Sequence, residues 1–239
     1  ESRVKKKNLK PQEIFDQFIK YDHGWKPATY DIYTQRLKYY FNNGFPDNPT
    51  SKSMTVRCLN RMFKWGYENH LISEFKPFKG GSKWKSRNRT FTKNEMNLIL
   101  NQVIPFHFQM FVRFAYYTGA RRSEICSLTL DNIEKGYFVG KLGSRMIKLN
   151  SQALEIIDSI DELWSYSPFY VSQTFKKNLR RLNIKDGRFH DLRRTFGLNL
   201  IKKGMSIYEL SKLLGHSSVK TTEKHYAPLL VSEINDFIL

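Results

Sequence analysis

The chain has 239 residues, of which 40% are hydrophobic and 15% aromatic, enough apolar surface for one large folded domain or two smaller ones. Its 40 Lys and Arg against 22 Asp and Glu give a formal net charge of +18, which argues against an enzyme of small metabolites. No apolar run approaches the roughly eighteen residues of a membrane-spanning helix. We therefore expect nucleic acid as the partner, with a merely solubilising surface or a membrane surface as weaker alternatives.

Two features of the sequence favour an intracellular protein. The first residues, ESRVKKKN, contain no apolar secretory signal and no initiator methionine, so we expect a trimmed or mature chain. Cys58 and Cys126 lie far apart in apolar helical patterns, which is typical of small buried side chains in a reducing compartment. We expect no disulfide, no metal site and no cofactor.

Residues 1–80 are predicted to form a small helical bundle. Helical periodicity runs over 11–20, 27–42 and 50–70. The apolar residues assigned to the last two helices are Ile32, Leu37, Tyr40, Phe41, Val56, Leu59, Met62, Phe63 and Tyr67. The same helices carry cations, of which we expect these to contact DNA phosphates: Arg36, Lys52, Arg57 and Arg61. Each of these cations alone could equally be part of a solvated surface.

A basic interdomain linker is predicted over residues 81–90. The stretch KGGSKWKSRNRT joins a Gly-Gly pair to five basic residues and contains no acidic one. Lys83, Lys85 and Arg87 are further candidates for phosphate contact. A second domain is expected over 91–239.

The second domain begins with helices. Thr92 and Glu95 have the spacing of a capping box, which predicts a helix start. An apolar helix over 105–118 is expected to end at Gly119. A short helix directly after it would place Arg121 near its N-terminus.

The only β signal is a hairpin. YFVGKL and RMIKL flank Gly143-Ser144, which predicts two antiparallel strands with Lys141 near the tip. Further helices are predicted at 151–160, 168–182, 190–203, 206–214 and 218–226. The predicted fold class is mainly α with a small antiparallel β-sheet, in two domains.

Three basic residues could handle a phosphate together. His190 and Arg193 are three residues apart on one predicted helix, so both side chains can reach one point. Two arginines facing one phosphodiester would neutralise its nonbridging oxygens, and Arg121 is the second candidate. Alternatively, His190 simply begins its helix, with Asp191 favourable in the first turn. Lys141 by itself could be a solvated hairpin charge.

Four motifs together resemble one family. TGARRSEICSLTLDNI, GKLGSRMIKL, HDLRRTF and LLGHSSVKTTEKHYAPL follow one another in the order and approximate spacing of the tyrosine recombinase (phage integrase) family, including its Xer-like members. The match covers nearly all of 91–239. The helices of 1–80 are also similar to that family's core-binding, DNA-clamping domain, although their sequence is generic.

The resemblance implies a phosphate clamp. Arg121 and Arg193 resemble the two catalytic arginines of the family. His190 and His216 resemble the histidines that hydrogen-bond the phosphate and assist proton transfer. Glu124 resembles the acidic residue that orients a catalytic arginine.

The resemblance also implies a nucleophile and a general acid. Tyr226 resembles the tyrosine that forms a 3′-phosphotyrosyl bond to DNA, so that neither metal nor ATP is needed. It lies ten residues after His216, where many members have nine, so its helix should be set slightly differently. Lys141 resembles the hairpin lysine that protonates the leaving 5′-oxygen. The hairpin is one residue shorter than in Xer-like sequences, which leaves Lys148 as the alternative.

The implied function is site-specific DNA recombination, as integration, excision or resolution. Its partners would be double-stranded DNA, three further copies of the chain in a tetramer on paired sites, and accessory DNA-bending or host proteins. No membrane is involved. The location would be the cytoplasm, with the nucleoid, or the host cytoplasm for a chain encoded by a virus or mobile element.

Three other functions are compatible with the same residues. The segment SIYELSKLLGHSSVKTTEKHY also resembles a helix-turn-helix, which would make a transcription regulator. A type IB topoisomerase shares the same chemical groups but acts alone and without choosing a site. A basic structural DNA-binding protein would use all of them as scaffold. A regulator has no need of Tyr226 at that helix, nor of Arg121 and Lys141 upstream.

Overall fold

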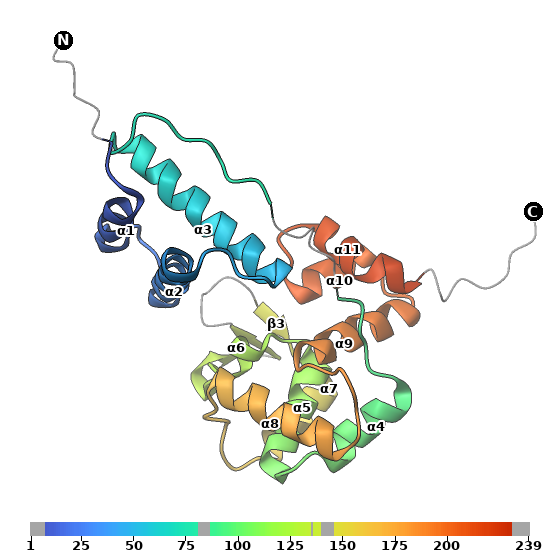
Figure 1. Cartoon of the computed structure of the whole chain (residues 1–239). Helices are drawn as coiled ribbons and strands as arrows, with labels where there is room; N and C mark the ends of the chain where they lie inside the picture. The colour runs from blue at the N-terminus through green and yellow to red at the C-terminus, as the bar shows by residue number, and fades with distance from the viewer. Residues whose placement is uncertain (1–7, 81–86, 135, 140–145, 231–239) are drawn as a thin grey trace, which may run out of the picture. The chain divides into compact units, whose positions relative to one another are not determined.

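The chain divides into two compact units, Glu1–Lys85 and Ser86–Leu239 (Figure 1). The computed structural model describes residues 8–80, 87–134, 136–139 and 146–230. The boundary between the units lies inside the segment predicted as the linker. The predicted fold class, mainly helical with a small antiparallel sheet, is confirmed.

The first unit consists of three helices in its described part. They are α1 (Pro11–Lys20), α2 (Pro27–Asn43) and α3 (Pro49–Glu68). Each begins with proline, whose fixed φ suits the first turn and whose missing N–H would have no partner there. These bounds lie within two residues of the predicted ones.

An aromatic and aliphatic core joins these three helices. Ile14, Leu37 and Leu59 are fully buried in it. The assignment of Ile32 and Tyr67 to the packed faces was wrong, because these side chains are 46% and 44% exposed. Each lies five residues from a buried residue of its own helix, which is about 140° around the helix axis.

The second unit is built around the apolar helix α5 (Phe106–Thr118). Phe108, Phe111 and Phe114 of α5 are fully buried. The helix α5 packs most extensively against α4 (Lys93–Gln102), α7 (Ser151–Asp158) and α9 (His190–Lys202). The capping box predicted at the start of α4 is present, because Thr92 Oγ1 accepts from the Glu95 N–H and the Glu95 carboxylate accepts from the Thr92 N–H.

A three-stranded antiparallel sheet lies beside the helices. Its order is β1 (Ile133–Glu134), β2 (Tyr137–Val139) and β3 (Met146–Lys148). Phe138 pairs with Ile147, so the predicted hairpin is confirmed in these strands. The tip, residues 140–145, lies outside the described residues. The strand β1 was not predicted, because two residues are too short to show an alternating pattern.

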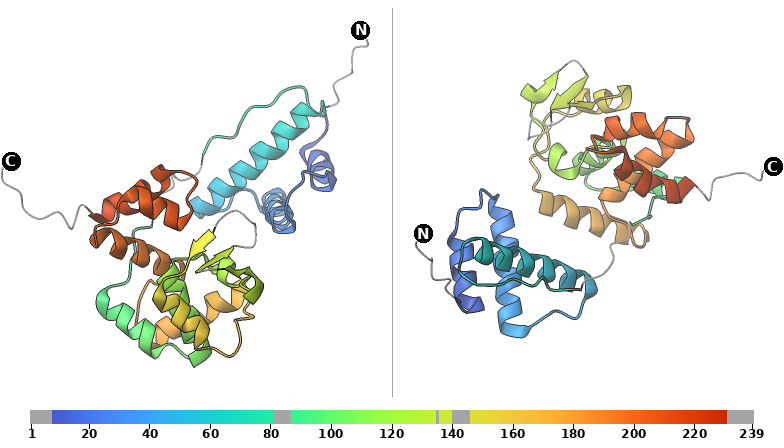
Figure 2. Two further views of the ribbon diagram at one scale, coloured as in Figure 1. Left: turned by 180° about the vertical axis from the view of Figure 1, so that it is seen from behind. Right: turned by 90° about the horizontal axis from the view of Figure 1, so that it is seen from above.

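The C-terminal helices form a separate small cluster. Outside this cluster, the short helix α6 (Arg122–Ile125) contacts α8 (Pro168–Arg181). Within it, α10 (Ile207–Leu214) and α11 (Val219–Leu230) pack on each other and on α9 (Figure 2). Leu198, Leu210, Leu214 and Tyr226 make up the buried centre of this cluster. The helix α11 continues four residues past its predicted end at Tyr226.

Candidate active site

A left-handed turn sets the position of Arg121. The helix α5 ends at Gly119, whose φ is 60°. A Cβ there would also lie 2.4 Å from Cδ1 of Phe196, so glycine satisfies both the backbone and the space. Arg121 then caps α6, as predicted, and its backbone N–H donates to Oε2 of Glu124 at 2.6 Å. Arg121 Nη1 donates to Oε1 of the same carboxylate at 2.9 Å, so Glu124 holds both ends of this arginine.

Arg121 and Arg193 meet at the carboxyl end of α10. Arg121 Nη2 donates to the Gly215 carbonyl at 3.2 Å, and Arg193 Nη2 donates to the Leu214 carbonyl at 2.5 Å. Arg193 Nη1 reaches back to the Gly119 carbonyl at 2.6 Å. Carbonyls at a helix C-terminus carry partial negative charge, so they suit two cations. The structure thus brings together two arginines that are 72 positions apart in the sequence.

His216 lies against the same arginine. Its Nε2 is 3.3 Å from Arg193 Nη2, and its Nδ1 is 2.8 Å from Oγ1 of the buried Thr222. Gly215, in the left-handed region at φ 59°, ends α10 and turns the chain to place this histidine. The ring is therefore fixed between α9 and α11.

His190 is the first residue of α9, one turn before Arg193. Surrounding protein atoms, followed by Arg193 and Arg194, lower the pKa of His190 to about 4, while Asp191 opposes them. His190 is exposed to solvent, which weakens such shifts. The direction makes His190 neutral at pH 7, able both to donate and to accept a hydrogen bond.

Tyr226 lies beside the arginines in a closed seat. Its side chain is 2% exposed, and its hydroxyl donates to the Arg193 carbonyl at 3.4 Å. A Cβ at Gly197 would lie 2.3 Å from the Tyr226 oxygen, so this seat exists only because residue 197 is glycine. Burial raises the pKa of Tyr226 to about 12, although Arg193 and Arg194 lower it. The phenol is therefore next to the site but turned toward the main chain of α9.

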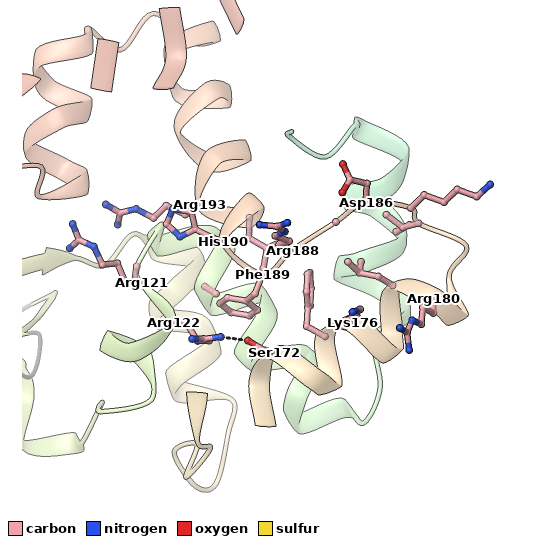
Figure 3. A pocket seen from close by; sticks show the side chains of 18 of the residues that line it. Arg121, Arg122, Ser172, Lys176, Arg180, Asp186, Arg188, Phe189, His190 and Arg193 are labelled. Carbon is pink, nitrogen blue, oxygen red and sulfur yellow. Dashed lines mark hydrogen bonds between the residues drawn. The ribbon is translucent and has the colours of Figure 1, made fainter. Parts of the chain in front are cut away.

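A cleft of about 920 Å³ leads from this cluster along α8 (Figure 3). Arg121, His190 and Arg193 lie at one end of it. Five other cations line the cleft, namely Arg122, Lys176, Arg180, Lys185 and Arg188, and all but Arg122 were missed from the sequence. The spacing of Lys176 and Arg180, four residues apart on one helix, was the available signal. A concave surface with this charge fits an extended anion.

Comparison with known proteins assigns the chain to a family. The phage integrase family matches residues 167–233, which include α9 to α11. The chain is 26% identical to tyrosine recombinase XerA of Pyrococcus furiosus over 264 aligned positions, covering 92% of this chain and 91% of the relative. A XerA of Pyrococcus horikoshii is 24% identical and covers 88% of this chain and 87% of the relative. The chain belongs to the tyrosine recombinase family.

Solved structures agree with the fold of this recombinase. A lambda integrase dimer bound to a COC′ core site matches with a TM-score of 0.78 at 17% identity, covering 98% of this chain and 81% of the integrase. A lambda integrase tetramer bound to a Holliday junction matches with a TM-score of 0.70 at 19% identity, covering 88% of this chain and 78% of the integrase. By sequence, this protein is a site-specific tyrosine recombinase. By structure, it has the integrase fold.

Some predicted site residues are placed elsewhere in the recombinase or not described. Lys141, Lys83 and Lys85 lie outside the described residues. Lys148 is exposed on β3, opposite Tyr137. Arg87 is not on an open basic face, because its guanidinium binds two carboxylates of the second unit.

The cations predicted for the first unit have looser surroundings. Arg57 and Arg61 are exposed on α3, four residues apart on one side of the helix. Arg36 Nη1 donates to the Ser51 carbonyl at 3.3 Å, and Lys52 Nζ lies 5.6 Å from the centre of the Phe45 ring. Within residues 8–80, then, these cations are held by weak contacts or none that fix their direction.

The described residues contain neither a metal-binding cluster nor a membrane-spanning helix. No group of three or more His, Cys, Asp or Glu among them is arranged to hold a metal ion. Over the same residues, no helix has both the length and the apolar character needed to cross a bilayer.

Proposed function

We propose that this recombinase cuts and rejoins DNA strands through a covalent bond between Tyr226 and a DNA 3′-phosphate, and thereby integrates, excises or resolves DNA. The proposal includes that no metal ion and no ATP take part. The observation that carries it is the meeting of Arg121, Arg193 and His216 at the end of α10, directly beside Tyr226.

The arginines are proposed to clamp the scissile phosphate. A guanidinium offers paired donors that match two phosphate oxygens, and two of them would offset the charge that develops in the transition state. Glu124 fixes Arg121 before DNA arrives, and the Gly119 carbonyl does the same for Arg193. Donors that are already oriented need no reorganisation when the reaction occurs, which is why fixed side chains suit this role.

The chemical step is an in-line exchange of phosphate esters. The Tyr226 oxygen forms a bond to phosphorus, the bond from phosphorus to the 5′-oxygen breaks, and the ester energy is kept in the protein–DNA link. His190 and His216 accept a hydrogen bond or the phenolic proton, which the neutral state of His190 permits. Lys141, or in its place Lys148, gives a proton to the leaving 5′-oxygen. Attack by a 5′-hydroxyl of another strand reverses the step and completes the exchange.

Tyr226 has to leave its seat before it reacts. Its hydroxyl is buried against the main chain of α9, and its pKa is raised to about 12. We propose that DNA binding moves α11, so that the phenol comes to lie among the arginines. There the cationic surroundings would favour the phenolate.

Double-stranded DNA is the proposed substrate, bound by both units. The cleft cations Arg122, Lys176, Arg180 and Arg188 would follow the backbone near the scissile phosphate. The first unit would act as the DNA clamp, through the cations Arg36, Lys52, Arg57 and Arg61, with Lys83 and Lys85 following it. We further propose a tetramer on paired sites, supported by likeness to an integrase solved as a tetramer on a Holliday junction. Accessory DNA-bending or host proteins are compatible with this assembly, which would act in the cytoplasm where the DNA is.

The test is a covalent capture experiment. A duplex selected from a randomised pool by binding to the protein is nicked near the exchange point, so that the short 5′-hydroxyl fragment is lost after cleavage. Incubation in EDTA without ATP should give a protein–DNA adduct on a denaturing gel with the native protein and none with Tyr226→Phe. DNA binding without any adduct would overturn the proposal and favour a regulator. Relaxation of any supercoiled plasmid, regardless of sequence, would indicate a topoisomerase.

A further inference from the structure

A buried carboxylate lies in the first turn of α9, the helix that carries His190 and Arg193. Asp191 follows His190 in the first turn of α9, and its side chain is 1% exposed. Its Oδ2 accepts from the Arg188 N–H at 2.9 Å, and Arg194 Nη1 lies 3.7 Å from Oδ1. A buried charge of this kind is costly unless it is paired, so its partners decide where this turn of helix lies.

The main partner of Asp191 comes from a distant part of the sequence. Arg87 Nη2 donates to Oδ2 at 3.1 Å, and Nε is 3.3 Å from each oxygen. The same guanidinium donates from Nη1 to Asp186 at 3.1 Å. Arg87 is therefore held between two carboxylates 104 and 99 positions away, and only 22% of its side chain is exposed.

The segment 87–91 attaches to α9 at two further points. The Arg87 carbonyl accepts from Arg194, and the Phe91 N–H donates to Thr195 Oγ1 at 2.9 Å. That hydroxyl in turn donates to the Asp191 carbonyl at 2.8 Å. Contacts from one short segment thus hold residues 191, 194 and 195, which surround the base of Arg193.

The loop before α9 also packs on this segment. Asp186 adopts φ 50°, an uncommon conformation that presents its carboxylate to Arg87. A Cβ at Gly187 would lie 2.8 Å from Cε1 of Phe91 and 2.6 Å from Cδ1 of Leu179. The loop before α9 therefore fits segment 87–91 only with glycine at this point.

We propose that Arg87 is a positioning residue for strand cleavage: by holding Asp191, it fixes the first turn of α9 and so aims His190 and Arg193 at the scissile phosphate. This inference rests on the proposed function of the site. Arg87 acts through Asp191 and does not touch DNA, which replaces the prediction from sequence that it contacts phosphate.

The electrostatics support the same role. The charged and titratable groups that face His190 are Arg193, Arg194 and Asp191 on α9 and His225 on α11. Of these only Asp191 favours the protonated imidazole. With Arg87 beside it, the carboxylate is partly neutralised, and His190 stays neutral at working pH.

The test compares Arg87→Gln and Arg87→Lys with Arg89→Gln. Arg89 is the control, because it lies two residues away with a 21% exposed side chain, but its ion pair, at 2.5 Å, is with Glu95 of α4, and its contact with the loop before α9 is a single long hydrogen bond to the Lys185 carbonyl at 3.4 Å. The readouts are single-turnover adduct formation at saturating suicide duplex, DNA affinity, and titration of His190 by NMR. Arg87→Gln should slow adduct formation by about 10- to 100-fold, since small misplacements of catalytic groups have effects of this size. Arg87→Lys, which keeps the charge but loses the fork, should be slowed less.

The remaining readouts separate positioning from other roles. DNA affinity should be unchanged in all three variants, and the His190 midpoint should rise in Arg87→Gln alone. Adduct formation at the native rate in Arg87→Gln, or an equal slowing in Arg89→Gln, would overturn the inference. A loss of DNA affinity specific to the Arg87 variants would overturn it too and would restore the phosphate contact.

Two further arms keep the test decisive. If Arg87→Gln does not fold, Arg87→Lys and Asp191→Asn carry the comparison, and their double variant should be no slower than the slower single one. If the native protein forms no adduct, the proposed function fails. The His190 titration then still decides whether Arg87 acts on His190 through Asp191.

Discussion

The basic face of the first unit and the arginine cluster of the second hold their cations in different ways. On α3, Arg57, Arg61 and Lys64 are exposed, and the ion pair of Lys64 with Glu68 is long, at 3.6 Å between exposed side chains. In the second unit Arg121 and Arg193 are bound by main-chain carbonyls at 3.2 Å or less. One face leaves its cations exposed, whereas the other fixes their direction.

This difference separates binding from chemistry. Affinity for a DNA backbone depends on how many phosphates are neutralised, and exposed cations are sufficient for that. Stabilising one transition state requires donors at fixed places, which carbonyl and carboxylate partners provide. Substitutions that keep charge but change geometry should therefore affect only the second unit.

The largest expected effect tests whether the cluster acts through Tyr226 at all. Tyr226→Phe should abolish the covalent adduct while DNA affinity stays within about twofold. The fold should be nearly unaffected, because the lost hydrogen bond is long, at 3.4 Å, and such bonds contribute about 1 kcal/mol or less. A denaturing gel and a urea unfolding curve measure the two quantities. An adduct that persists in this variant would move the nucleophile elsewhere.

The next prediction compares the same substitution in the two units. Arg193→Lys and Arg121→Lys keep the charge but lose the fork, so adduct formation at saturating DNA should fall by about 100- to 1000-fold. Arg57→Lys is the matched control and should leave both rate and affinity unchanged. Single-turnover gels with the suicide duplex measure the rates. Equal tolerance of lysine in both units would remove the distinction between fixed and exposed cations.

Neutralising the first unit should have the opposite signature. Arg57, Arg61 and Lys64 changed together to Gln should weaken DNA binding and reduce the salt slope of the binding constant by up to about 2.7, or about 0.9 for each lost phosphate contact. Cleavage at saturating DNA should remain at the native rate. Binding isotherms over a range of salt concentrations provide the slope. An unchanged slope would show that α3 does not face DNA.

The sequence predicted where the helices and strands lie far better than how the side chains of the site are buried and paired. Capping pairs such as Thr92 with Glu95 are local, and local spacing decides where a helix begins. The burial of Tyr226 depends on Gly197, 29 positions away, and the use of Arg87 depends on Asp191. Such contacts between distant segments leave no periodic signal, so the motifs pointed to the residues proposed to react but not to their resting positions.

The seat of Tyr226 can be tested from its other wall. Gly197→Ala should displace the ring, because a Cβ would lie 2.3 Å from its oxygen and 2.6 Å from Cζ. The phenol pKa should then fall from about 12 toward 10, seen as the ultraviolet titration difference between Gly197→Ala and its double variant with Tyr226→Phe. The fold should lose about 1–2 kcal/mol through overpacking.

A glycine in the first unit is the control for that change. Gly66 in α3 is also buried, and its Cβ would lie 3.0 Å from Cγ2 of Ile14. Gly66→Ala should therefore lower stability without moving any phenol titration near 12. A phenol midpoint that is unmoved in Gly197→Ala would show that Tyr226 does not rest in the buried seat.

The smallest expected effect concerns the charge state of His190. Its folded pKa is lowered from 6.5 to about 4, so the unfolded chain takes up this proton first as the pH falls. Stability contributed by neutral His190 should therefore be complete above about pH 6.5 and be lost between there and about pH 4, and the exposure of His190 to solvent reduces its size. Urea unfolding at pH 7 and pH 5 should show a smaller acid loss in His190→Gln than in the native protein. An NMR midpoint near 6.5 for His190 would show that Arg193 and Arg194 do not lower its pKa. The difference between the two units would then be limited to how Arg121 and Arg193 are held.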